Sequence, residues 1–246
     1  MDKPVLLMIH GLVGSLDYFD PASRLAGATV ETCDLLGYGT FGNVLPGQLT
    51  LETQVEHVAE RIRALGRTGV WVLGHSMGGA IALLLADRHA GLVEGLINVE
   101  GNFTLKDAFW SSVIVAKPPE EWRDEYMNMQ RDIAGWLERC GVRPTPQRVQ
   151  WGEHLLANQP ADTVYAMSKA LLTQPGRPSY LEAASRIVER GVPVHLIAGE
   201  RSAAAWDVPD FVRAAAKSYT VIPDVGHIMM LEKPDEFCKT VDRLFC

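Results

Sequence analysis

The sequence predicts an α/β fold in which a mostly parallel central sheet is flanked by helices. Short apolar runs alternate along the chain with longer segments of helical periodicity, a pattern typical of parallel strands joined by crossover helices. These runs are apolar almost throughout, which indicates strands covered on both faces. The six predicted strands are Val5–Ile9, Thr29–Cys33, Val70–Leu73, Leu92–Val99, Val194–Ala198 and Ser218–Ile222.

Helices are predicted between and after these strands. The clearest follows Thr50, whose hydroxyl can cap it, and places Val55, Val58 and Ile62 on one face. Pro234 suits the first turn of the last helix, because a first-turn N–H needs no partner within the helix. The predicted helices are Thr50–Leu65, Gly79–His89, Val208–Ala216 and Pro234–Leu244.

The strand pattern stops between residues 102 and 180. Two proline-containing segments, Lys117–Pro119 and Arg143–Pro146, break this stretch into several short helices. We expect a helical cap over the carboxyl edge of the sheet, with residues 1–101 and 181–246 forming the core. Most aromatic side chains of the cap are expected to pack it onto the core, and a few to line a pocket.

Composition restricts the classes of function. The chain has 246 residues, of which 47% are hydrophobic and 22% charged, as in ordinary globular enzymes. Its formal net charge of −7 argues against nucleic acid or an anionic membrane surface as partner. We find no apolar stretch of membrane-spanning length and no signal-peptide pattern at the N-terminus, so a cytoplasmic protein is expected.

The four cysteines are Cys33, Cys140, Cys238 and Cys246. They show neither a C-x-x-C pair nor a spacing suited to zinc, and reduced thiols are expected. Cys33 is placed at the end of a buried strand, and Cys246 is terminal. No motif for a metal, nucleotide or flavin is present, so no cofactor and no metal site are expected.

The most informative pattern lies at residues 70–80. An apolar run leads directly into Gly74–Gly78, which reads GHSMG, and an apolar helical segment follows. A serine between a strand end and a helix start, with glycine two residues away on each side, is the nucleophile-elbow pattern. The glycines allow strand and helix to approach closely. Ser76 is therefore the candidate catalytic nucleophile, and the alternative is a structural Gly-Ser turn.

A serine hydroxyl needs a general base within hydrogen-bond reach. His227 is the candidate among seven histidines, because its loop directly follows the last predicted strand and opens at the same edge as Ser76. The alternative is a surface-loop histidine. The other histidines are expected in turns beside the site (His10, His75), on helices (His57, His89), in the insertion (His154) and inside a strand (His195).

The turn His10–Gly14, after the first strand, predicts an oxyanion hole. Its glycines allow the backbone N–H of Leu12 to point at a developing oxyanion, and Met77, which follows the nucleophile, supplies the second N–H. An ordinary strand-to-loop turn is the alternative interpretation.

Four segments, taken in order and spacing, resemble one family: His10-Gly11, Asp34–Gly39, Gly74–Gly78 and Gly226-His227. They resemble the α/β-hydrolase-fold serine hydrolases of the esterase and lipase type, and the resemblance extends from end to end. It implies an eight-stranded sheet with an antiparallel edge strand, a helical cap after the sixth strand and acyl-enzyme chemistry. In a chain this short, the first two strands are expected to be missing or vestigial.

The chain departs from this family at the triad acid. The family usually places an aspartate after the penultimate strand, where this chain has Ser202. Some members instead carry the acid at the end of the strand after the nucleophile helix, where this chain has Glu100. We expect Glu100 to orient His227, although it could simply cap the following turn. The alternatives are Asp207 first, then Asp210 and Glu200.

These residues predict a carboxylic-ester hydrolase for a small or medium acyl substrate, acting as a monomer or homodimer. Trp110, Phe103 and Ile228 are candidate substrate contacts. Cleavage of a thioester, a lactone or a carbon–carbon bond, and hydroxynitrile lyase activity, remain alternatives on the same fold. Dehalogenases and epoxide hydrolases are disfavoured, because they carry aspartate at the position of Ser76. The alternative outside enzymes is a ligand-binding receptor of the hydrolase fold.

Overall fold

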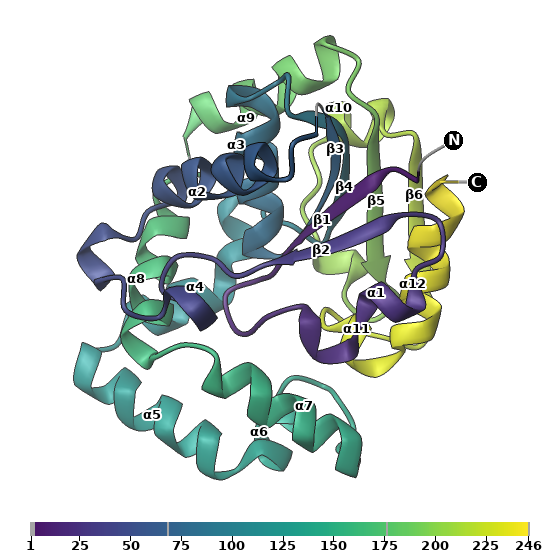
Figure 1. Cartoon of the computed structure of the whole chain (residues 1–246). Coiled ribbons are helices and arrows are strands. Elements are labelled where there is room, and N and C mark those ends of the chain that lie inside the picture. The colour runs from purple at the N-terminus through teal and green to yellow at the C-terminus, as the bar shows by residue number, and fades with distance from the viewer. Residues whose placement is uncertain (1–2, 68, 176, 246) are drawn as a thin grey trace.

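The computed structural model describes residues 3–67, 69–175 and 177–245 (Figure 1). Within these residues the strands form one all-parallel sheet in the order β2-β1-β3-β4-β5-β6. The strands are β1 (Val5–Ile9), β2 (Thr29–Cys33), β3 (Val70–His75), β4 (Val93–Val99), β5 (Val194–Gly199) and β6 (Ser218–Ile222). All six predicted strands are confirmed. The sheet seen in the described part of the chain is smaller than the eight-stranded sheet that the resemblance implies.

The helices begin where the sequence offers caps and prolines. Thr50 accepts the N–H of Thr53 and caps α2, while Pro119, Pro146 and Pro234 occupy the first turns of α5, α7 and α12. Over the described residues the helices are α1 (Pro21–Arg24), α2 (Leu51–Ala64), α3 (Met77–Arg88), α4 (Phe109–Val115), α5 (Pro119–Arg131), α6 (Ile133–Arg139), α7 (Pro146–Ala157), α8 (Ala161–Leu172), α9 (Pro178–Glu189), α10 (Asp210–Ala215), α11 (Met229–Glu232) and α12 (Pro234–Asp242).

Each face of the sheet is covered by its own apolar core. Leu7 and Val72 belong to the core that includes side chains of α2, α3 and α9. Leu6 and Leu73 point to the other face and belong to the core that includes side chains of α11 and α12. Because successive side chains of a strand point to opposite faces, strands covered on both sides are apolar almost throughout, as β1, β3, β4 and β5 are. The expectation of full cover is wrong for β2 and β6, which lie at the two edges of the sheet and are mostly half-buried.

We call residues 102–180 the helical segment. Its two ends lie in contact with each other. The hydroxyl of Tyr180 donates a hydrogen bond to the carbonyl of Asn102 at 2.5 Å. Helices α5, α6 and α7 form a layer beyond the carboxyl ends of the strands (Figure 1). The expected boundary at residue 180 falls within α9, which packs on the core helix α3.

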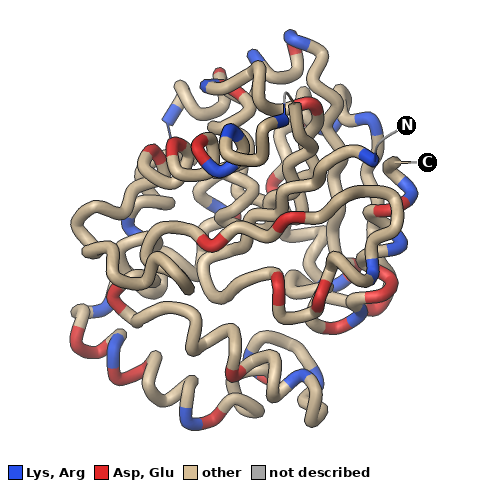
Figure 2. The backbone as a smooth tube through the Cα atoms, in the orientation of Figure 1, with Lys and Arg blue, Asp and Glu red and all other residues tan. Residues whose placement is uncertain are grey.

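The surface carries both signs of charge. Figure 2 shows lysine and arginine interspersed with aspartate and glutamate over the molecule. None of the described helices combines the length and apolarity needed to cross a membrane. Cys33, Cys140 and Cys238 are free thiols, with Cys33 buried at the end of β2, whereas Cys246 lies outside the described residues.

Two glycines let the loop after β4 lie against the start of α3. A Cβ built on Gly79 would lie 2.5 Å from the Cα of Gly101, and one built on Gly101 would lie 2.6 Å from the Cα of Gly79. Real Cβ atoms do not approach backbone this closely. At Gly79 and Gly101 the helix and the loop are therefore in direct main-chain contact.

Alanine at Gly79 should destabilise the fold. The added methyl group forces two backbone segments apart, and we expect the free energy of unfolding to fall by about 2–3 kcal/mol in urea titrations. Gly91→Ala is the matched control, because a Cβ there meets no atom within 4 Å. Equal stability of the two variants would contradict this account of the contact.

Candidate active site

Ser76 lies in a strained turn between β3 and α3. Its φ of 54° and ψ of −121° are uncommon for a residue other than glycine. The turn is fixed on both sides, because the N–H of Ser76 donates to Val99 O at 3.0 Å and the N–H of Asn102 donates to Ser76 O at 3.3 Å. A Cβ on Gly74 would lie 2.3 Å from Gly78 O, so the flanking glycines make this turn possible.

Glu100 and His227 are brought together by the fold. Oε2 of Glu100 lies 2.6 Å from Nδ1 of His227, and the Glu100 side chain is only 3% exposed. Its other oxygen accepts hydrogen bonds from the N–H of Gly199 at 2.8 Å and the hydroxyl of Ser202 at 2.6 Å. Burial acts to raise the pKa of Glu100, but His227 and these donors outweigh it and hold the pKa below its usual range.

The paired carboxylate determines which nitrogen of His227 carries the proton. An ionised carboxylate can only accept, so Nδ1 of His227 is the protonated nitrogen and Nε2 is left free to act as a base. In the described part of the chain the hydroxyl of Ser76 has no hydrogen-bond partner. In hydrolases without bound substrate, the hydrogen bond between a serine nucleophile and its base is often long or absent.

His75 connects the serine turn to the histidine loop. Its Nε2 lies 2.9 Å from the carbonyl oxygen of His227, and the two rings lie 4.7 Å apart. Burial lowers the pKa of His75 to about 3, so the ring is neutral and its single N–H donates to that carbonyl. The loop that carries His227 is thereby held beside Ser76.

His10 orients the peptide group that precedes Leu12. Its Nε2 accepts the N–H of Leu35 at 3.3 Å, so the proton resides on Nδ1, which donates to Gly11 O at 2.8 Å. Burial lowers the pKa of His10 to about 4, which keeps this ring neutral. Because a trans peptide points its N–H opposite to its carbonyl, the N–H of Leu12 faces away from His10.

The backbone N–H groups of Leu12 and Met77 have no hydrogen-bond partner among the residues the structure describes. Met77 is the first residue of α3, where the helix leaves its N–H groups unpaired and its dipole favours negative charge. The carbonyl of Leu12 accepts the hydroxyl of Tyr38 at 2.9 Å. A Cβ on Gly11 would lie 3.1 Å from Cβ of Ser76, so this turn packs directly against the serine.

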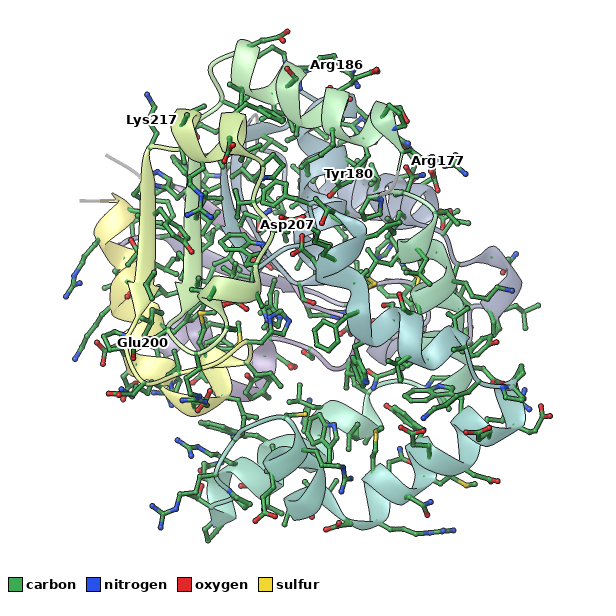
Figure 3. The ribbon with its side chains drawn as sticks, turned by 180° about the vertical axis from the view of Figure 1, so that it is seen from behind. Arg177, Tyr180, Arg186, Glu200, Asp207 and Lys217 are labelled. Atoms are coloured by element: carbon green, nitrogen blue, oxygen red, sulfur yellow. The ribbon has the colours of Figure 1, made fainter. Side chains whose placement is uncertain are left out.

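The alternative acids are engaged elsewhere. Asp207 accepts the hydroxyl of Thr104 at 2.7 Å, and Glu200 accepts the N–H of Asp224 at 2.9 Å. Asp210 is the exposed first residue of α10. Figure 3 labels Asp207 and Glu200, which lie at separate places in that view. The structure thus brings a different carboxylate, from the end of β4, to the candidate base.

The three candidate substrate contacts differ in environment. Phe103 is 1% exposed and its ring packs 6.0 Å from that of Trp206, as a core side chain would. Trp110, on α4, is half-buried with its ring 6.3 Å from that of Trp122. Ile228 is half-buried and directly follows His227. Only Ile228 is adjacent in sequence to a candidate catalytic residue.

Ser202 stands at the usual acid position of the family, and the sequence alone predicts no role for it. In the structure its hydroxyl donates to Glu100, and Nε1 of Trp206 donates to Gly101 O at 2.8 Å. The loop after β5 therefore holds the segment that carries Glu100. The only sequence signal for this contact was a polar residue at the usual acid position. In the part of the chain that the structure describes, no cluster of three or more histidine, cysteine or acidic residues could hold a metal ion.

The fold agrees with the comparison to known families. A model of the alpha/beta hydrolase family matches residues 6–240, and the chain belongs to this family. An esterase from Exiguobacterium antarcticum superposes with a TM-score of 0.74 at 20% identity, covering 99% of this chain and 92% of that one. This likeness shows a shared fold.

Two curated relatives are similar in sequence over part of their length. A 2-succinyl-6-hydroxy-2,4-cyclohexadiene-1-carboxylate synthase from Yersinia pseudotuberculosis serotype O:1b is 30% identical over 148 residues, or 58% of this chain and 47% of that protein. A putative carbamate hydrolase RutD from Enterobacter cloacae subsp. cloacae is 34% identical over 106 residues, or 42% of this chain and 39% of that protein. The chain spans less than half the length of these relatives.

Acid should destabilise the protein partly through His10. Its pKa is about 4 in the folded state against an ordinary value of 6.5, so below pH 6.5 the unfolded chain binds a proton that the folded chain does not. This contribution to stability is complete above pH 6.5 and is lost toward pH 4, by about 3 kcal/mol. In urea titrations between pH 7 and 4.5, His10→Asn should lose less stability than the wild type. Parallel profiles would show that His10 is not the source.

Proposed function

We propose that this hydrolase is a serine carboxylic-ester hydrolase for small or medium acyl groups. The observation that carries the proposal is the 2.6 Å contact between Glu100 and His227 beside the strained turn of Ser76. A buried carboxylate on Nδ1 leaves Nε2 of the imidazole as a base and stabilises the imidazolium that forms when the serine is deprotonated. The arrangement supports acyl transfer through a covalent intermediate.

In the proposed reaction, Nε2 of His227 takes the Ser76 proton while Oγ attacks the ester carbonyl. The N–H groups of Leu12 and Met77 stabilise the oxyanion of the tetrahedral intermediate. The intermediate collapses when His227 protonates the leaving alcohol, which leaves an acyl-serine. His227 then deprotonates a water molecule that attacks this acyl group, and collapse of the second intermediate returns the proton to Ser76 and releases the acid.

We further propose that the helical segment acts as a cap that selects the acyl group. Support comes from two residues that lie close in sequence to the proposed catalytic groups. Ile228 directly follows the proposed base, and Trp110 belongs to α4, the first α-helix after Glu100. These half-buried apolar side chains suit an acyl chain better than a charged one.

The comparisons support hydrolase chemistry and leave other leaving groups as alternatives. The carbamate hydrolase relative favours a second candidate, because a carbamate carbonyl is open to the same serine attack. Lactone, thioester and carbon–carbon substrates would also use the proposed nucleophile and base. A receptor that binds without turnover is the alternative outside catalysis.

The primary test is hydrolysis of p-nitrophenyl esters from acetate to octanoate. We expect nitrophenolate release by the wild type and a loss of about 10⁴-fold or more in kcat for Ser76→Ala and for His227→Ala. The chain-length profile then measures the acyl site. Activity retained in Ser76→Ala would contradict the proposal. Silence of folded wild-type protein across the series would move support to a carbamate, a carbon–carbon substrate or a receptor.

The acid is tested by two amide substitutions of equal size change. Glu100→Gln keeps the shape of the side chain but removes the negative charge that stabilises the imidazolium, and kcat should fall by about 10²–10⁴-fold. Asp207→Asn is the matched control and should stay within about threefold of wild type, because surface ion pairs contribute little. A collapse of kcat in Asp207→Asn alone would make Asp207 the acid.

A further inference from the structure

A second buried carboxylate, that of Glu232, follows the proposed base His227 closely in the sequence. Oε1 of Glu232 accepts the N–H of Gly226 at 2.7 Å, and Oε2 accepts Nη2 of Arg201 at 2.6 Å. The Glu232 side chain is 8% exposed, and Glu232 ends α11. The residue immediately before His227 is therefore held by a charge-assisted hydrogen bond from outside its own loop.

Arg201 ties the same loop to the helical segment. Its Nη1 donates to the carbonyl of Asp224 at 2.7 Å, and its Nη2 donates to the carbonyl of Gly141 at 3.1 Å. Gly141 lies in the turn between α6 and α7. A planar guanidinium can make these bonds together with the one to Glu232, whereas an ammonium group lacks that fixed fork of donors.

The helical segment reaches Glu232 a second time through α7. Nη2 of Arg148 donates to the backbone carbonyl of Glu232 at 2.7 Å, and its Nη1 donates to the carbonyl of Arg143 at 2.9 Å. Residues from the α6–α7 region thus contact both the main chain of Glu232 and the side chain of its ionic partner.

The imidazole depends on this backbone support. The His227 side chain is 45% exposed and is anchored at Nδ1 to Glu100. Its loop is held at the Gly226 N–H by Glu232 and at the His227 carbonyl by His75. A misplacement of about 1 Å in a reacting group can lower the rate 10²-fold. The hydrogen bonds that fix the backbone of this loop should therefore affect kcat.

We propose that Glu232 is a positioning residue for the base, and that Arg201 and Arg148 make this positioning depend on the α6–α7 region of the helical segment. The proposal rests on the function proposed above for Ser76 and His227. It assigns Glu232 no contact with substrate. Its effect passes through the loop backbone to the imidazole.

The experiment compares Glu232→Ala with Glu236→Ala, which removes an exposed carboxylate from the neighbouring helix α12. We expect kcat for a p-nitrophenyl ester to fall by about 10–100-fold in Glu232→Ala, with KM within about threefold of wild type, and neither value to change in Glu236→Ala. Glu232→Gln should recover part of the loss, because its amide oxygen still accepts the Gly226 N–H.

The decisive readout is the same substitution in a protein that lacks the base. If Glu232 acts through His227, Glu232→Ala should not lower the residual rate of His227→Ala further. Thermal unfolding of each variant establishes that it is folded at the assay temperature, and Glu232→Gln provides the measurement if Glu232→Ala does not fold.

Three results would overturn the proposal. The first is a kcat for folded Glu232→Ala or Glu232→Gln equal to that of Glu236→Ala. The second is a fall in kcat on Glu232→Ala that is just as large in the His227→Ala background, and the third is an equal loss of kcat in folded Glu232→Ala and Glu232→Gln. The Ser76→Ala control separates the two proposals. Activity that survives Ser76→Ala refutes the catalytic assignment itself, whereas activity that requires Ser76 but ignores Glu232 refutes only the positioning role.

Discussion

The site depends on main-chain contact between loops at the carboxyl edge of the sheet. Gly79 and Gly101 place the loop after β4 against the start of α3, and a Cβ on Gly199 would lie 2.4 Å from Gly226 O. Side chains at these positions would separate the segments that carry Ser76, Glu100 and His227. The hydrogen bonds of 2.6–2.9 Å across the site depend on backbones that lie this close.

Placing the carboxylate at the end of β4 changes what the loop after β5 does. Ser202 and Gly199 donate to the buried Glu100, and Trp206 donates to the next carbonyl along that segment. An unpaired carboxylate buried to this degree would be costly, and these donors offset the cost. The β5 loop therefore supports the carboxylate at the end of the neighbouring strand.

Much of the fold could be predicted because its signals are local. Apolar runs identified the central strands of the sheet in the described residues, and the glycines around Ser76 indicated its turn. The predicted helix start at Gly79 is two residues late, because β3 ends at His75 and α3 begins at Met77, directly after Ser76. Val208 was also predicted as helical, but α10 begins only after Pro209, at Asp210.

The unpredicted part of the site consists of contacts between residues far apart in the chain. The bond from Arg201 to Gly141 and that from the Gly14 N–H to Oε1 of Gln159 span 60 and 145 residues. No periodicity or motif marks such partners, because their proximity arises only when the helical segment packs onto the loops. The sequence shows that no aspartate stands at the usual acid position, but only the folded structure shows that Ser202 donates a hydrogen bond to Glu100.

Glu100 is separated from Asn102, where the helical segment begins, by a single glycine. That segment returns to the core at Tyr180, which is hydrogen-bonded to Asn102 itself. The carboxylate of Glu100 therefore lies beside the point where the two ends of the helical segment meet. The packing of the helical segment and the placement of the His227 imidazole therefore share one short stretch of backbone, Glu100 to Asn102.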